Sequence, residues 1–149
     1  MHDASATGAE HVAETIRLDD GRAFVLRALR TDDLEALRRA FRRLTPEEVE
    51  LRFLHRAREL PTLIESEVRE LDPARDAAFV LEDTGEIRAV ADLHVEASDP
   101  ARAEFGLIVG QAIAGHGMGR LLMQRLLTEA RSRGLTLRGI VRRDNARML

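Results

Sequence analysis

The chain has 149 residues, a formal net charge of −3 and no cysteine. These values suit a single globular domain and exclude a disulfide-bonded scaffold, and the lack of a basic excess argues against nucleic acid as a partner. All 23 basic residues are arginines, so the chain carries neither a P-loop lysine nor a lysine for Schiff-base catalysis.

The first 15 residues are rich in small and acidic side chains, and we expect them to form a flexible leader rather than a secretory signal. The sequence contains no run of about 18 apolar residues of the kind that spans a bilayer, so no membrane contact is expected. These features favour a cytoplasmic location, with residues 16–149 forming one domain.

The segment that follows the leader predicts one strand and then several helices. Residues 22–28 begin with a β-rich apolar run, which predicts a strand. Thr31 predicts the N-cap of a helix that extends to Leu44, because apolar residues recur there at helical spacing. Pro46 predicts the start of a second helix, and residues 62–71 predict a third.

Beyond these helices the chain changes to short β-rich runs. Residues 76–83 and 86–96 predict two strands that the sequence DTGE joins as a hairpin, and residues 103–110 predict the next strand.

A glycine-rich segment leads to the last predicted elements. A helix is expected from Gly119 to about Arg133, where Gly134 ends it, and residues 135–141 predict a final strand. Antiparallel strands followed by a single strand–helix–strand crossover favour an α+β fold with a mixed sheet.

The glycine-rich segment AGHGMGR, residues 114–120, has a glycine at every second position. A turn of this kind between a strand and a helix presents backbone N–H groups at the positive end of the helix, and such an arrangement binds phosphates. The spacing G-x-G-x-G departs from the dinucleotide fingerprint G-x-G-x-x-G, and no acid ends the following strand, so a nicotinamide site is disfavoured. A flexible linker that binds nothing is the structural alternative.

Residues 109–149, from VGQAIAGHGMGR to RRDNARML, resemble the acetyl-CoA-binding core of the GCN5-related N-acetyltransferase (GNAT) superfamily. The family's loop has the pattern Q/R-x-x-G-x-G/A. Gly117 and Gly119 match its small positions, while Ala114 stands where glutamine or arginine is usual. The resemblance implies a GNAT-like fold in which this loop binds the pyrophosphate of acetyl-CoA and the preceding strand faces the pantetheine arm. The coenzyme-binding residues it implies are Leu107, Ile108, Val109, Ala114, Gly115, His116, Gly117, Met118, Gly119, Arg120 and Asn145.

Residues 44–83 are similar to bacterial Pat-type protein-lysine acetyltransferases, which implies acetyl transfer to an amine acceptor, expected to be a protein lysine. Those enzymes carry a catalytic glutamate in the stretch equivalent to AEF, and Glu104 fills that position. Independently of the resemblance, Glu104 is the one acid inside an otherwise apolar strand, where partial burial makes a carboxylate a better base. The alternative is a solvent-facing glutamate paired with Arg102.

Asp92, His94 and Glu96 alternate along one predicted strand, so their side chains share one face. They form either an acceptor-binding or proton-relay wall, or the solvated side of an antiparallel strand. The five histidines show no metal-ligand spacing, so no metal is expected.

Two departures from the family pattern bear on activity. The chain has no tyrosine, which many family members use as a general acid, and it stops at Leu149, in the first turn of a helix that normally leads to further strands. We therefore expect a fold without the usual C-terminal strands. Either the sequence is a fragment of a longer chain, or a partner chain or, in a homodimer, a second copy completes the sheet. A non-catalytic acyl-CoA-binding sensor or docking module is the alternative function.

Overall fold

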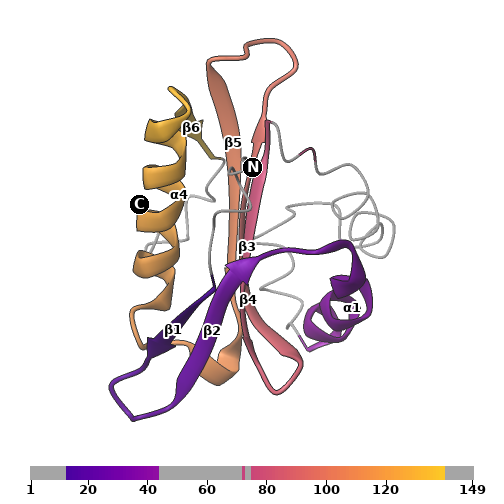
Figure 1. Ribbon diagram of the computed structural model, residues 1–149, viewed down its shortest axis with the longest axis vertical. Helices are drawn as coiled ribbons and strands as arrows, with labels where there is room; N and C mark the ends of the chain where they lie inside the picture. Colours follow the sequence, from indigo (N-terminus) through magenta and orange to yellow (C-terminus); the bar gives the residue numbers. More distant parts are fainter. Residues whose placement is uncertain (1–12, 44–71, 73–74, 140–149) are drawn as a thin grey trace, which may run out of the picture.

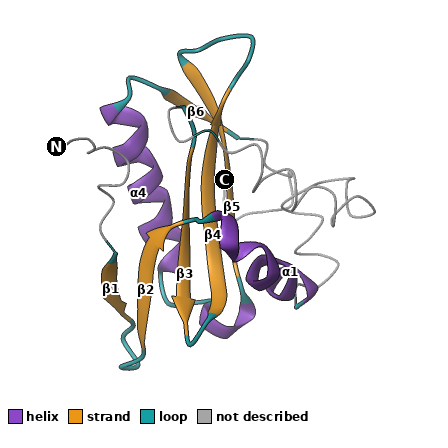
Figure 2. Ribbon diagram, turned by 45° about the vertical axis from the view of Figure 1, so that its right-hand side comes forward, coloured by secondary structure: helices purple, strands orange, loops and turns teal. Residues whose placement is uncertain are grey.

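The computed structural model describes residues 13–43, 72 and 75–139, and its centre is a six-stranded sheet with the order β1-β2-β3-β4-β5-β6. The strands are β1 (Glu14–Arg17), β2 (Ala23–Ala28), β3 (Ala77–Asp83), β4 (Glu86–Val95), β5 (Arg102–Val109) and β6 (Thr136–Arg138). Helix α1 (Leu34–Arg42) covers one face of the sheet and α4 (Met118–Ser132) covers the other (Figures 1 and 2). Two 3-10 helices, η2 (Thr31–Asp33) and η4 (Gln111–Ile113), precede α1 and follow β5.

All neighbouring strands run antiparallel except β5 and β6, which are parallel. The hairpin between β3 and β4 turns at Thr84 and Gly85, whose φ angles are 48° and 81°. Two consecutive positive φ angles are the signature of a type I′ turn, whose twist matches that of the flanking strands. The predicted mixed α+β sheet, with its hairpin at DTGE, is therefore confirmed.

The two faces of the sheet carry separate hydrophobic cores. Alternate side chains of β2 to β5 point toward α4, and the intervening ones point toward α1, as the two-residue period of a strand requires. The α4-face core includes Phe24, Leu26, Phe79, Leu81, Leu93, Ile113, Leu122 and Leu126. The α1-face core is smaller and consists of Leu37, Phe41, Val80, Ile87 and Val90.

A buried ion cluster fixes the start of α1 to the sheet. Two guanidinium nitrogens of Arg27 lie 2.8 and 2.9 Å from the two carboxylate oxygens of Asp33, and its Nε lies 2.5 Å from Glu82 Oε1. Burial by itself raises the pKa of the Asp33 carboxyl, but hydrogen bonds from Arg27 and from the Arg30 N–H outweigh burial and hold that pKa below its ordinary value.

Most element boundaries agree with the sequence predictions. The predicted strand 22–28 is β2, and the helix expected from Thr31 begins with the 3-10 turn η2 before α1. Strand β1 was not predicted, and its first two residues fall in the expected leader. The last predicted strand, 135–141, corresponds to β6, and only its residues 140 and 141 lie outside the described residues. Residues 1–12 of the leader, the helices expected within 45–71 and Asn145 also lie outside them. No helix in the described part of the chain is both long and apolar enough to cross a bilayer.

Asp33→Asn removes one charge from the buried cluster and leaves Arg27 with less compensation. We expect the free energy of unfolding at pH 7 to fall by about 3 kcal/mol. Because the folded-state pKa of Asp33 is depressed, the stability it supplies is present above the ordinary aspartate pKa of about 4 and is lost as the pH falls below that value. Urea unfolding should therefore show that the difference in the free energy of unfolding between parent and variant becomes smaller at acidic pH.

Asp32→Asn is the matched control, because the Asp32 side chain is 77% exposed and pairs with the exposed Arg30. Its effect should stay within about 0.5 kcal/mol at all pH values. An equal loss of stability in Asp33→Asn and Asp32→Asn would contradict the inference that the buried ion cluster stabilises the fold.

Candidate active site

Strand β5 has one edge that is only partly paired. Strand β4 pairs with β5 from Ala103 to Val109, whereas β6 pairs with β5 only from Arg102 to Glu104. Figure 2 shows β6 at one end of the sheet. Among the described residues no strand pairs with the second half of β5 on this side. Its backbone groups there can accept hydrogen bonds from, or donate them to, an extended ligand, as an edge strand does.

The residue that follows β6 lies close to β5. Gly139, just after β6, lies against the ring of Phe105, and a Cβ added to Gly139 would be 2.4 Å from Phe105 Cε1. Real Cβ atoms do not approach so closely, so this point of contact has room only for glycine. The chain and β5 meet closely here, immediately beyond the last paired residues.

The predicted pantetheine-facing residues Leu107, Ile108 and Val109 all lie on the half of β5 that β6 leaves unpaired. The side chains of Leu107 and Val109 pack against the α4-face core, and Ile108 packs against the α1-face core. What these residues offer along the open edge is therefore their backbone, while their side chains anchor the strand on both faces.

The glycine loop comprises residues 110–120, which connect β5 to α4 and include the first residues of that helix. Gly115 and Gly117 have φ angles of 84° and 78°, a region that favours glycine because it has no Cβ. The backbone N–H groups of residues 117–120 have no intrahelical partner, because the first hydrogen bond of α4 runs from the N–H of Leu121 to the carbonyl of Gly117. These donors, at the start of a 15-residue helix, form a nest suited to an anion.

The predicted side chains of this loop have different surroundings. Arg120 is exposed, so its guanidinium is available to an anion, whereas Met118 is buried in the α4-face core and has only its backbone to offer. The Nδ1 atom of His116 lies 2.7 Å from Asp19 Oδ1, in the turn between β1 and β2. The sequence contained no signal for this contact, which joins segments that are distant along the chain.

Glu104 lies at the last position where β6 pairs with β5, and its Cα is paired with that of His94 on β4. The expected partial burial is wrong, because the Glu104 side chain is exposed. The alternative pairing with Arg102 is not found either. The Nε of Arg102 lies 3.2 Å from Asp99 and 4.0 Å from Glu96, and no described residue forms an ion pair with Glu104.

The alternating residues of β4 form a polar wall next to Glu104 rather than a solvated strand face. Asp92 is 4% exposed, and its Oδ1 lies 3.4 Å from His94 Nε2. His94 Nδ1 lies 3.9 Å from the buried Asp76, and Glu96 Oε2 lies 3.2 Å from Arg138 Nε. Over the part of the chain that the structure describes, no group of three or more such side chains is arranged to hold a metal ion.

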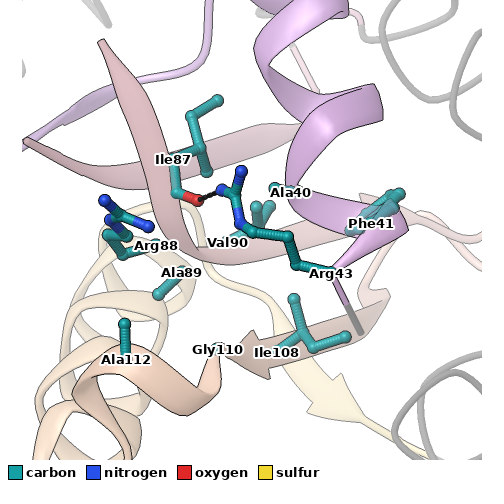
Figure 3. Close-up of a pocket in the computed structure, with 10 residues that line it drawn as sticks. All are labelled: Ala40, Phe41, Arg43, Ile87, Arg88, Ala89, Val90, Ile108, Gly110 and Ala112. Carbon is teal, nitrogen blue, oxygen red and sulfur yellow. Dashed lines mark hydrogen bonds between the residues drawn. The ribbon is translucent and has the colours of Figure 1, made fainter. Parts of the chain in front are cut away.

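A cavity of about 270 Å³ opens between α1 and the sheet on the same face as Glu104 (Figure 3). Its walls are mainly apolar, and Arg43 bridges it with a 3.1 Å hydrogen bond to the carbonyl of Ile87. The lining residues are Ala40, Phe41, Arg43, Ile87, Arg88, Ala89, Val90, Ile108, Gly110 and Ala112. Ile108 is about 13 Å along β5 from Glu104, so the cavity and the carboxylate are separate features of this face.

Comparison with known proteins agrees with this arrangement. The family model described as "Acetyltransferase (GNAT) family" matches residues 34–149, and the chain belongs to this family. Its members use acetyl-CoA as the acetyl donor and act on amine acceptors, so the chain is a GNAT-type N-acetyltransferase.

Three relatives illustrate the similarity. The chain is 29% identical to acetyltransferase PA5475 of Pseudomonas aeruginosa over 133 residues, which cover 87% of this chain and 70% of that protein. The GNAT domain of S. lividans PAT superposes with a TM-score of 0.74 at 21% identity, covering 91% of this chain and 82% of that one. A cAMP-binding acyltransferase from Mycobacterium smegmatis gives a TM-score of 0.61 at 26% identity, covering 91% of this chain but only 41% of the longer protein.

The glycines of the loop differ in what the fold itself requires of them. Gly117→Ala should lower the free energy of unfolding by about 1 kcal/mol, because alanine is strained at a φ of 78°. Gly119→Ala should leave stability unchanged or raise it by up to about 1 kcal/mol, because a Cβ there meets only Val109 Cγ2, at 4.0 Å, and alanine favours helix. Thermal unfolding of both variants measures the change in stability. Equal losses of stability in the two variants would contradict the inference that the fold requires glycine at 117 but not at 119.

Proposed function

We propose that the chain transfers the acetyl group of acetyl-CoA to a lysine of another protein, with Glu104 as the general base. The observation that carries this proposal is the continuity of the open edge of β5 with the anion-binding glycine loop. A ligand with an extended amide-containing arm and a diphosphate matches both parts at once. Acetyl-CoA has this construction.

The coenzyme would contact both parts mainly through the backbone. The pantetheine arm would pair with the edge of β5 at Leu107, Ile108 and Val109, and the diphosphate would accept hydrogen bonds from the N–H groups of residues 114–120. Arg120 adds a positive charge at the same helix end. Gly119 supports this arrangement, because the protein leaves space for a Cβ there and yet the position is occupied by glycine.

The chemistry that follows is direct attack. The acceptor ammonium loses a proton to the Glu104 carboxylate, and the free amine then forms a bond to the thioester carbonyl carbon. A backbone N–H of β5, at Leu107 or Val109, would donate to the oxyanion that develops on the carbonyl oxygen. The C–S bond then breaks, and the nitrogen loses its second proton as it becomes the amide. Water carries that proton to the leaving thiolate, since the chain contains no tyrosine.

A lysine acceptor suits the charge of the polar wall. Asp92 and Glu104 lie on one face of β4 and β5, and their carboxylates attract a protonated amine before it is deprotonated. The resemblance of residues 44–83 to Pat-type enzymes points to the same acceptor. The chain has no lysine of its own, so a lysine acceptor must belong to another protein.

Glu104→Gln should lower kcat/KM for acetylation of a lysine-containing protein by about 100-fold and leave the Kd for acetyl-CoA unchanged. Glu35→Gln is the control, because Glu35 is an exposed acid on α1 that forms an ion pair with the neighbouring Arg38. Thiol release and calorimetric binding would be measured for all three proteins. Coenzyme binding by the parent without thiol release, across a panel of lysine-containing acceptors, would favour the non-catalytic binding module.

Gly119→Ala should weaken acetyl-CoA binding by about tenfold or more while the protein remains as stable as the parent, because the added Cβ stands where the diphosphate approaches the helix end. Gln124→Ala, an exposed substitution further along α4, should not change the affinity. Calorimetric titration gives both values. Unchanged affinity in Gly119→Ala would place the diphosphate elsewhere.

A further inference from the structure

The turn between β1 and β2 contacts the glycine loop, although the two segments are 90 or more residues apart in the sequence. Both lie at the lower end of the molecule in Figure 1. We propose that this turn belongs to the coenzyme site and that Arg22 holds the glycine loop in the conformation that binds the diphosphate. This inference rests on the proposed function, because it assumes that the loop binds acetyl-CoA.

Arg22 is held firmly on its own side of the contact. Its Nε donates to Asp20 Oδ2 at 2.9 Å, and its backbone N–H donates to Asp20 Oδ1 at 3.0 Å. The backbone hydrogen bond from Arg22 is the main reason that the pKa of the Asp20 carboxyl lies below its ordinary value. The guanidinium carbon also lies 5.7 Å from the centre of the buried Phe24 ring, within cation–π range. The side chain is thus oriented before it reaches the loop.

The same guanidinium contacts the loop at two points. Its Nη1 donates to the carbonyl oxygen of Ala112 at 2.9 Å, and its Nη2 lies 3.4 Å from His116 Nε2. Arginine can only donate, so this geometry requires His116 Nε2 to be the acceptor. The Nδ1 atom of the ring is then the donor to Asp19 Oδ1, which lies 2.7 Å away.

These contacts decide which groups of the loop face the anion. The carbonyl of Ala112 and the ring of His116 are both directed to the turn, one on each side of residues 113–115. A carbonyl oxygen aimed at a diphosphate would repel it, whereas the N–H groups of residues 117–120 have no intrahelical partner and can donate to an anion. By holding a carbonyl away from the site, the turn leaves the donors of the loop available to the ligand.

Arg22 acts by orienting the loop through its hydrogen bonds and not by attracting the anion with its charge. Its charge is already opposed by Asp20 at hydrogen-bond distance, and Asp19 lies on the other side of His116. A lysine at this position keeps the charge but has a single ammonium group in place of the planar fork. It cannot reach Asp20, Ala112 and His116 together. Comparison of Arg22→Lys with Arg22→Gln therefore separates positioning from charge.

The test is calorimetric titration of the full chain with acetyl-CoA, together with steady-state kinetics. Arg22→Gln and Arg22→Lys should each weaken binding by about tenfold and raise the KM for acetyl-CoA, with kcat and the KM for the amine unchanged. Arg17→Gln makes the same charge change on β1, where no described hydrogen bond or ion pair joins Arg17 to the loop, and should bind within about twofold of the parent. Thermal unfolding confirms that each variant is folded.

The outcomes separate this inference from the function on which it rests. No binding of acetyl-CoA by the parent would overturn the proposed coenzyme site and the role of Arg22 together. Binding by the parent that is equally tight in Arg22→Gln would overturn only the role of Arg22. Full affinity in Arg22→Lys with a loss in Arg22→Gln would show that charge alone matters, and would overturn the positioning role.

Discussion

The partial pairing of β5 is the constraint on which the rest of the site depends. Backbone N–H and C=O groups in a folded protein need partners, and β4 supplies them along one whole edge of this strand. On the other edge, within the part of the chain that the structure describes, β6 supplies them only from Arg102 to Glu104, and Gly139 lies against Phe105 just beyond. The strand is thus held in place by β4 and still has backbone groups on its other edge that can form hydrogen bonds with a ligand.

The glycine loop completes this template with groups that owe little to side-chain identity. Two of its glycines are required by positive φ angles, and a third stands where the protein itself would accept a larger residue. Orientation comes from outside the loop, through the turn that carries Arg22. The backbone site that we propose would recognise the shape and charge of a diphosphate, and it would accept an alanine at position 114 because no side chain is needed there to form the nest.

Much of this architecture was predictable from local patterns. The alternation of apolar residues identified β3, β4 and β5, and the glycines with Gly134 located α4. Strand β1 was missed because its sequence, ETIR, contains a single apolar residue, and the strand is defined by its pairing with β2. Local propensity is weak evidence where tertiary contacts make the strand.

The site was predictable only in part, for two physical reasons. Strand β5 is apolar on both faces, so its sequence does not show which side chains point to solvent, and the exposure of Glu104 could not be inferred from it. The contact of Arg22 with Ala112 and His116 joins distant segments, and no local pattern encodes it. The burial of Asp92 likewise depends on packing against other parts of the fold, which an alternating sequence cannot reveal.

The alternation of β5 also has an evolutionary consequence. Phe105, Leu107 and Val109 serve the core beneath α4, while Glu104 and Ile108 face the opposite side of the sheet, and the coenzyme would meet only the backbone between them. Mutations on the α1 side can therefore accumulate without disturbing either the packing under α4 or the main-chain template. Related proteins with such a strand can therefore evolve to use new acceptors and keep the same acetyl donor. Acceptor recognition would depend on side chains of one face, whereas donor binding would depend on the backbone.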